Sequence, residues 1–421
     1  MERANHSKPQ LMFYLFQRAL ALALFSCSFA LCHQASARTI YVAPGGSGSG
    51  AISAPLGDVS RAARAAGAGD KIVLRGGVYD LQKGVYLDKP GVSLVGFRGE
   101  KPVLRAPSDE SSPVASVVVV TAPRVLVSGL EIRGGSYYGL KIDVDEAKTP
   151  ARGVIVRGCR IGATGRDCVK TFNADQLLIE SCNIGPSGLR DPSNAEGIDS
   201  IGSRGVKIRN CFVHDIATNG IYFKGGTTDG VVEGCHLQNM RFGSGILLGQ
   251  DTDAEFMRDG TPFEARRCVA RNNIVSGAAG SGVGTFSGEN IRFENNTLLN
   301  VARQSGAGLW VVVNRRGVAS RGVSFNRNIV VQSGARPFVF LQDMAGTLAA
   351  QNNLYFSTGN AGVFRIERQR SVRNLPLSVW RAAIGGDSGS RIANPLVDSA
   401  RGYKPRAGSP ALGRGVRIGA R

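Results

Sequence analysis

The sequence predicts an all-β fold, a parallel β-helix in which the chain winds as a solenoid of stacked coils. Short strands that alternate apolar and polar residues recur along the 421 residues, and each ends on a small or amide residue. An apolar residue and a second short strand, which begins with a glycine and an apolar residue, follow each of these ends. The 56 glycines suit the corners of such coils, because corners need left-handed backbone angles.

The strand ends share one repeated position, which holds cysteine four times and then asparagine four times. These residues are Cys159, Cys182, Cys211, Cys235, Asn273, Asn296, Asn328 and Asn353, at intervals of 23, 29, 24, 38, 23, 32 and 25 residues. One coil cannot bury its own apolar face, but coils stacked roughly 4.8 Å apart share a continuous core. Stacked asparagine amides can hydrogen-bond along the axis, and a thiol can fill the same inward corner. A β-propeller would need frequent hairpin turns, which the sequence lacks.

The N-terminus has the order of a secretory signal, with a basic start, the apolar run 19–31 and the small residues 35–37. We expect cleavage before Arg38 and a secreted or periplasmic protein. The apolar run is short for a membrane span. A lipoprotein signal at Cys27 is the alternative.

Both ends of the solenoid have candidate caps. A strand over 39–43 precedes a short amphipathic helix within 57–70, which would cover the open edge of the first coils. A second short helix is predicted over 375–386. We therefore divide the chain into a signal peptide (1–37) and one β-helix domain (38–421) with an N-terminal cap (38–70) and an irregular C-terminal tail (375–421).

Cysteines and charge limit the possible partners. The six cysteines that follow the signal are predicted to be buried free thiols, and the absence of a CxxC spacing argues against a zinc site. The chain has 51 Lys and Arg against 32 Asp and Glu, a formal charge of +19. Outside the cytoplasm this charge favours an acidic polysaccharide, anionic lipid or an envelope surface over nucleic acid, although a merely solvated basic surface would give the same count. We expect a monomer without a membrane span.

Three segments and the coil repeat resemble a known superfamily. They are TIYVAPGGSGSG (39–50), GDKIVLRGGVY (69–79) and the tail NPLVDSARGYKPRAGSPALGRG (394–415). They are similar to the secreted right-handed parallel β-helix proteins of the pectate-lyase-like superfamily. This superfamily includes family 9 pectate lyases, chondroitinase B with its alginate-lyase relatives, and mannuronan C5-epimerases. The resemblance implies a right-handed helix that acts on carbohydrate.

Aligning the "Gly-apolar" phrases predicts which side chains share one outer face, because alternate residues of a strand point outward. One outward column reads Lys141, Lys170, Asp199, Tyr222, Leu247 and later Trp310, and the next includes Asp143, Phe172 and Lys224. We predict Lys170, Asp199, Tyr222 and Lys224 as catalytic residues and Lys141, Phe172 and Trp310 as substrate-binding residues. Long insertions at 144–152, 186–195 and 251–267 are expected to stand on one flank and wall a groove. The alternative is that Asp199 caps a corner and that the lysines are solvated.

Breaking a uronate polymer by β-elimination requires that the sugar carboxylate is neutralised, that a base takes the C5 proton and that the leaving oxygen gains a proton. Calcium held by carboxylates, or a lysine or arginine, can neutralise the carboxylate. A lysine whose pKa is lowered by neighbouring cations can be the base, although Asp199 would oppose that shift unless it binds metal.

The family motifs match only in part. The segment Ala195 to Asp199 resembles the D-D-x-x-D calcium cluster of family 9 pectate lyases at two of its three acidic places, which implies Glu196 and Asp199 as metal ligands. Lys224-Gly225-Gly226 resembles the segment around their base. The epimerase motif D-P-H-D keeps only Asp199, and the hallmarks of chondroitinases and polygalacturonases are absent. We predict a polysaccharide lyase; the alternatives are a non-catalytic carbohydrate-binding protein and a C5-epimerase or hydrolase.

Overall fold

The computed structural model describes residues 37–359, 363–398 and 403–415. The chain divides into two units, Met1–Ala37 and Arg38–Arg421, and the second holds the fold. The predicted signal peptide lies outside the described residues, except for Ala37. None of the helices in the described part of the chain is both long and apolar enough to cross a membrane.

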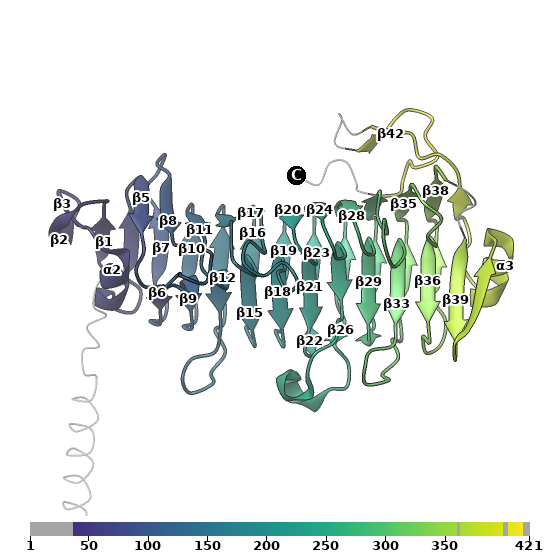
Figure 1. Cartoon of the computed structure of the whole chain (residues 1–421), viewed down its shortest axis with the longest axis horizontal. Helices are drawn as coiled ribbons and strands as arrows, with labels where there is room; N and C mark the ends of the chain where they lie inside the picture. The colour runs from purple at the N-terminus through teal and green to yellow at the C-terminus, as the bar shows by residue number, and fades with distance from the viewer. Residues whose placement is uncertain (1–36, 360–362, 399–402, 416–421) are drawn as a thin grey trace, which may run out of the picture. The chain divides into compact units, whose positions relative to one another are not determined.

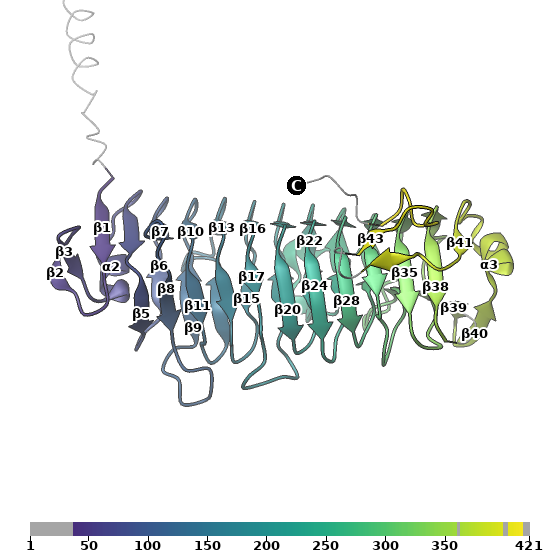
Figure 2. The ribbon, with the colours of Figure 1, turned by 90° about the horizontal axis from the view of Figure 1, so that it is seen from above.

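Three long sheets, called A, B and C, run through Arg38–Arg421, and each coil contributes one strand to each sheet (Figures 1 and 2). Pairing between successive coils is parallel, so the predicted parallel β-helix is confirmed.

Sheet A contains, in chain order, β1 (Thr39–Val42), β2 (Ser47–Ala51), β3 (Ala54–Leu56), β4 (Lys71–Leu74), β7 (Ser93–Gly96), β10 (Leu126–Ser128), β13 (Ile155–Arg157), β16 (Leu178–Glu180), β19 (Lys207–Arg209), β23 (Val231–Glu233), β27 (Val269–Arg271), β31 (Arg292–Glu294), β34 (Ser324–Asn326) and β37 (Ala349–Gln351). Sheet B contains β5 (Gly77–Asp80), β8 (Pro102–Arg105), β11 (Glu131–Arg133), β14 (Arg160–Gly162), β17 (Asn183–Ile184), β20 (Phe212–Ile216), β24 (His236–Met240), β28 (Ile274–Ala278), β32 (Thr297–Leu299), β35 (Ile329–Gln332), β38 (Leu354–Ser357) and β41 (Arg391–Ile392). Sheet C contains β6 (Val85–Leu87), β9 (Ser116–Val120), β12 (Tyr138–Ile142), β15 (Val169–Phe172), β18 (Ile198–Ile201), β21 (Ile221–Lys224), β25 (Ile246–Leu248), β29 (Val283–Phe286), β33 (Leu309–Val312), β36 (Val339–Gln342), β39 (Phe364–Arg368) and β40 (Ser371–Leu375). Short strands outside these sheets are β22 (Thr227–Thr228), β26 (Ala265–Arg266), β30 (Gly288–Glu289), β42 (Val397–Asp398) and β43 (Lys404–Pro405).

The inward side chains form a continuous apolar core. In sheet A, Val156, Ile179 and Ile208 stack in register on successive coils and are fully buried. Burying each such side chain stabilises the fold by about 1.5–3 kcal/mol. Because alternate residues point inward, the same strands must turn their other side chains outward, and this fixes where a site can lie.

The predicted column of cysteine and asparagine lies at an inner corner. Its four cysteines are buried free thiols, as are Cys168 and Cys268, so this prediction is confirmed. The Asn273 amide donates to Asn296 Oδ1 at 3.0 Å, and the Asn296 amide donates to Asn328 Oδ1 at 3.0 Å. The Asn328 amide continues the ladder to Asn353 at 3.2 Å. These bonds satisfy buried amides and hold neighbouring coils in register.

Both predicted short helices form. Helix α2 (Val59–Ala65) starts at Asp58, whose carboxylate accepts a 3.0 Å hydrogen bond from the Arg61 amide. It buries Val59, Ala62 and Ala63, and Ser60 Oγ lies 3.2 Å from the Lys83 carbonyl beside β6. Its action as a cap against aggregation stays a prediction. Helix α3 (Leu377–Ile384) ends at Gly385 in the left-handed conformation. The predicted irregular tail also includes β41 and the antiparallel pair β42 and β43.

The long insertions do not all stand on one flank, in contrast to the prediction. Residues 144–152 and 251–264, with the 3-10 turns η1 (Ala254–Phe256) and η2 (Arg258–Gly260), follow the C-terminal ends of β12 and β25 (Figure 1). Residues 186–195 instead precede the N-terminal end of β18. Since the strands of sheet C are parallel, the insertions flank this sheet on both sides.

Candidate functional site

The outward column of sheet C has the predicted register. Lys141 pairs with Lys170, Lys170 with Asp199, and Asp199 with Tyr222. Phe172, Ile201 and Lys224 form the next outward column. Side chains that are 29 and 23 residues apart in sequence are therefore brought side by side by the stacking of β15, β18 and β21.

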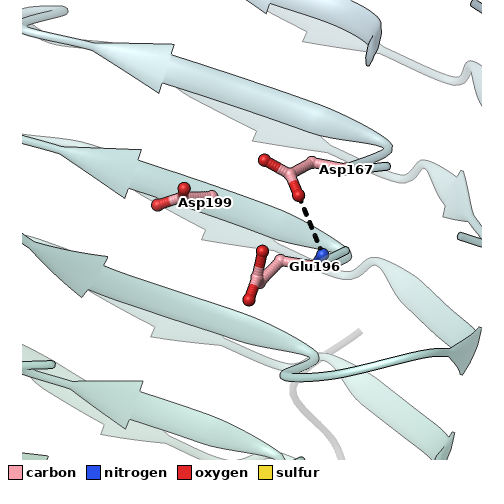
Figure 3. Close-up of side chains that lie close together, drawn as sticks. All are labelled: Asp167, Glu196 and Asp199. Carbon is pink, nitrogen blue, oxygen red and sulfur yellow. Dashed lines mark hydrogen bonds between the residues drawn. The ribbon is translucent and has the colours of Figure 1, made fainter. Parts of the chain in front are cut away.

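Three carboxylates converge at this column. Asp199 lies on β18, and Asp167 and Glu196 lie in the turns that precede β15 and β18 (Figure 3). One oxygen of each carboxylate lies within 4.8 Å of the others, and all three residues are buried. The Glu196 amide donates a 3.0 Å hydrogen bond to Asp167 Oδ1, drawn as the dashed line in Figure 3. Thr218 donates to Glu196 Oε1 at 2.8 Å.

Two lysines and a tyrosine complete the cluster. Lys170 pairs with Asp199 and lies 3.4 Å from Asp167 Oδ2. Lys224 Nζ lies 3.9 Å from Asp199 and donates a 2.6 Å hydrogen bond to the Tyr222 hydroxyl. Each lysine side chain is 16% exposed, whereas Asp199 is fully buried and Tyr222 is nearly so. The lysines therefore form the accessible surface of the cluster, and the carboxylates lie beneath them.

Burial and repulsion between carboxylates shift Glu196 and Asp167 toward their neutral forms. Burial, followed by the charges of Asp167 and Asp199, raises the pKa of Glu196 well above its usual value. Burial also raises the pKa of Asp167, although Lys170 opposes that shift. Burial and the nearby carboxylates raise the pKa of the Tyr222 phenol, so it keeps its proton at neutral pH. Several strongly shifted pKa values in one small cluster are typical of sites for acid and base chemistry.

The lowered pKa expected of a lysine base is not found at Lys170. Burial alone would lower the pKa of Lys170, but the charges of Asp199 and Asp167 outweigh burial and raise it. Asp199 and Asp167 form ion pairs with Lys170 and dominate the shift, so the expected mutual effect of the lysines is not seen. Lys170 is therefore a permanent cation in this arrangement and is poorly suited to take a proton.

Two buried carboxylate oxygens, Glu196 Oε2 and Asp199 Oδ1, have no hydrogen-bond partner among the described residues. Unpartnered buried acceptors are rare and are compatible with a bound cation. Three oxygen donors of this kind fit a hard cation such as Ca²⁺ in chemical type. Lys170 competes for two of these carboxylates, so it would have to move for a metal to bind.

The family model described as "Right handed beta helix region" matches residues 142–329, which include the whole cluster. Together with the parallel coils, this match decides the fold class. The protein is a right-handed parallel β-helix.

Solved structures are similar to this β-helix at low sequence identity. The mannuronan C-5 epimerase A-module of Azotobacter vinelandii is 13% identical, with a TM-score of 0.57 over 80% of this chain and 93% of that one. A rhamnogalacturonan lyase is 12% identical, with a TM-score of 0.53 over 75% and 87%. The Dettilon tailspike protein is 14% identical, with a TM-score of 0.49 over 71% of this chain and 62% of that one. No curated protein sequence matches this chain. These likenesses concern the fold.

The remaining predicted residues lie around the cluster of the β-helix. Lys141, one coil earlier, pairs with Asp143 at 2.6 Å. Phe172 packs edge-on against Phe256 of the 251–264 insertion, with ring centroids 6.0 Å apart. Trp310 continues the outward column beyond Leu247 and Gly284, and it stacks on Phe340. Lys141 and Phe172 thus border the cluster, whereas Trp310 lies three coils beyond Tyr222 on the same face.

Asp167 is the site residue that sequence reasoning missed. It stands one residue before Cys168, as Glu196 stands one residue before Gly197, so the two residues occupy equivalent positions on successive coils. The repeated "Gly-apolar" phrase could have indicated Asp167, but on this coil the phrase is Cys168-Val169 and begins with cysteine instead of glycine. Extending the alignment by one residue would have identified the third carboxylate.

Proposed function

We propose that this β-helix is an exported polysaccharide lyase that cleaves a uronate polymer by β-elimination. The observation that carries the proposal is the contact between Lys224 and Tyr222 beside the Lys170–Asp199 ion pair. It supplies a candidate base, a candidate acid and a fixed cation within one cluster. The fold shared with an epimerase module and a lyase supports action on carbohydrate.

The charge distribution supports an acidic substrate. The partly exposed groups of the cluster are the side chain of Lys170, which is a cation, and the side chain of Lys224, and the carboxylates lie buried beneath them. A sugar that approaches this surface meets positive charge first. A uronate carboxylate is attracted to such a surface, whereas a neutral sugar gains no electrostatic advantage from it.

The residues divide the reaction as follows. Lys170 neutralises the sugar carboxylate, which makes the C5 proton more acidic. The neutral amine of Lys224 takes that proton, the C5–H electrons form the C4–C5 double bond, and the C4–O bond breaks. Tyr222, which keeps its proton at neutral pH because burial raises its pKa, gives that proton to the leaving oxygen. Lys224 then returns the proton to Tyr222 through their 2.6 Å hydrogen bond, and both groups regain their starting states.

Asp199 acts through the other groups. It has no exposed surface, and it pairs with Lys170 while Lys224 lies 3.9 Å away. It is therefore a positioning residue that holds the ammonium group of Lys170 in place. Ca²⁺ is a separate proposal: Asp167, Glu196 and Asp199 would hold it after Lys170 moves, and the bound ion would supply charge neutralisation of the sugar carboxylate.

The test is a screen of pectate, alginate and glycosaminoglycans for the ultraviolet absorbance of the new C4–C5 double bond. A lyase gives this absorbance together with new reducing ends. Binding with neither signal would support the non-catalytic alternative, and a change of sugar configuration without cleavage would support the epimerase.

Lys224→Ala tests the assigned base. We expect it to lower turnover by about 10²-fold or more, the usual contribution of general acid–base catalysis. Lys207→Ala is the matched control, because Lys207 is an exposed lysine on β19 of sheet A. Equal turnover in the wild type and in Lys224→Ala would exclude Lys224 as the base.

A further inference from the structure

A second group of cationic and aromatic side chains lies beside the cluster. Arg166 directly precedes Asp167, and Arg190 lies in the 186–195 insertion. The guanidinium carbons of these two arginines lie 5.7 Å and 4.4 Å from the centre of the Tyr137 ring. Tyr137 in turn contacts Tyr138, whose ring centre lies 5.8 Å from Lys170 Nζ. The two arginines are thus connected to the proposed reaction site through two adjacent rings.

The backbone places the arginines together. Arg190 and Asp191 both donate backbone hydrogen bonds to the Gly165 carbonyl, at 3.1 Å and 2.9 Å. The insertion therefore lies directly against the residue that precedes Arg166. Arg166 Nε donates to the Asn194 carbonyl at 3.0 Å, and Arg190 Nε donates to the Ser136 carbonyl at 2.7 Å. Each guanidinium is anchored in this way before any ligand arrives, which lowers the entropy cost of binding.

The outer nitrogens of both guanidinium groups remain available. None of the terminal Nη atoms of Arg166 or Arg190 donates a hydrogen bond to a described residue. Asp191 lies 3.5 Å from Arg166 Nε, and it already accepts a 2.6 Å hydrogen bond from Ser193. Glu110 lies 3.7 Å from Arg190 Nη1 and is largely exposed, so water screens that pair. Neither carboxylate forms the paired, fork-like contact that guanidinium groups favour.

We propose that Arg166 and Arg190 form an anion subsite that binds the carboxylate of a second uronate unit, next to the unit that reacts. Their Nη atoms bind the carboxylate, and the ring of Tyr137, which is 39% exposed, offers an apolar face to the sugar. This inference rests on the proposed function, because it takes the substrate to be a uronate polymer. It adds that the substrate carries charge on neighbouring sugars, so that a block of uronates binds better than an isolated one.

The experiment measures binding by calorimetry in a Lys224→Ala background, where turnover does not interfere. The ligands are oligomers of galacturonate, mannuronate, guluronate and glucuronate, each as the free acid and as the methyl ester, which removes the charge and keeps the sugar. We expect Arg166→Gln and Arg190→Gln each to weaken binding of the free acid about tenfold and to leave binding of the ester unchanged. Arg160→Gln is the matched control, because Arg160 is an exposed arginine of the same coil on sheet B.

Each outcome decides the proposal. Equal losses of affinity for the acid and the ester would mean that the arginines only hold the insertion in place. Unchanged affinity for the acid would mean that they do not contact the ligand. Either result overturns the subsite. Failure of every uronate oligomer to bind overturns both the subsite and the proposed substrate. If the two arginine variants lose affinity for the free acid alone while the wild type forms no C4–C5 double bond, the result supports the subsite and contradicts the proposed lyase activity. Thermal unfolding of each variant shows whether the fold is kept.

Discussion

Two columns of ionic side chains run along the solenoid, one on sheet A and one on sheet C. On sheet A the charges alternate in register as Arg157, Glu180, Arg209, Glu233, Arg271 and Glu294. There Arg209 and Glu180 lie 2.8 Å apart, Arg271 and Glu233 lie 2.9 Å apart, and the arginines are about half exposed. On sheet C three buried carboxylates share two lysines, and two carboxylate oxygens have no hydrogen-bond partner within the described part of the chain.

The difference separates structural charge from functional charge. Stacking alone produces both columns, because coils in register bring equivalent positions together. In the ladder of sheet A each charge lies beside an opposite charge and the arginines are about half exposed, so the interactions are satisfied and weak. In the cluster of sheet C the charges are buried and unevenly matched, which costs stability and makes proton transfer possible.

The largest expected contrast is in turnover. Tyr222→Phe removes the proposed proton donor and should lower the rate of double-bond formation by about 10²-fold or more. Arg209→Ala in the ladder should leave that rate unchanged, because Arg209 lies on a different sheet. The ultraviolet assay measures both. Retention of full activity in Tyr222→Phe would break the distinction between the two columns.

Stability should show the second contrast. Asp199→Asn leaves Lys170 buried without its main counter-ion and should lower the free energy of unfolding by about 3 kcal/mol. Glu180→Gln removes one member of the ladder, whose arginine partners are about half exposed, and should cost less than about 1 kcal/mol. Urea unfolding followed by circular dichroism compares the two variants. Similar losses would mean that burial does not distinguish the columns.

Cation binding offers a third comparison. Lys170→Met removes the ammonium group that competes for Asp199 and Asp167 and should raise Ca²⁺ affinity about tenfold. Lys207→Met provides the control from sheet A. Calorimetric titration with Ca²⁺ after chelation measures the affinities. A lower affinity in Lys170→Met than in the wild type would show that Lys170 does not compete with the ion.

The smallest contrast concerns pH. At Glu180 burial opposes ionisation, but the hydrogen bonds from Arg157 and Arg209 outweigh burial and lower the pKa of the carboxyl group. Ionised Glu180 therefore stabilises the fold above its unfolded pKa, and this stabilisation is lost as the pH falls through the folded pKa. Glu196 has a raised pKa, so the fold loses stability as pH rises from the unfolded value of 4.5 toward the folded one. Glu196→Gln should therefore raise stability at neutral pH by about 1 kcal/mol, and Glu180→Gln should lower it. Both differences should shrink in acid, as thermal unfolding at several pH values would show.

The sequence was sufficient for the fold and for most of the column. The cysteine and asparagine position and the "Gly-apolar" phrase are repeated local signals, and Lys170, Asp199 and Tyr222 follow from aligning them. The pKa of Lys170 could not be predicted in the same way, because it depends on how closely Asp199 and Asp167 approach from other positions. The neighbouring positions of Arg166 and Arg190 depend on the path of the 186–195 insertion, which no periodicity specifies.

The pairing of Lys170 with Asp199 limits how this protein can change during evolution. A solenoid can lengthen by duplicating a whole coil, since a new copy extends the apolar interior and meets its neighbours through the same hydrogen bonds. A copy inserted between β15 and β18 would keep the fold but move the lysine about 4.8 Å farther from the aspartate. Duplication beyond β36 would leave their spacing unchanged. Natural variation in coil number should therefore be tolerated near the C-terminal end and selected against between residues 139 and 226.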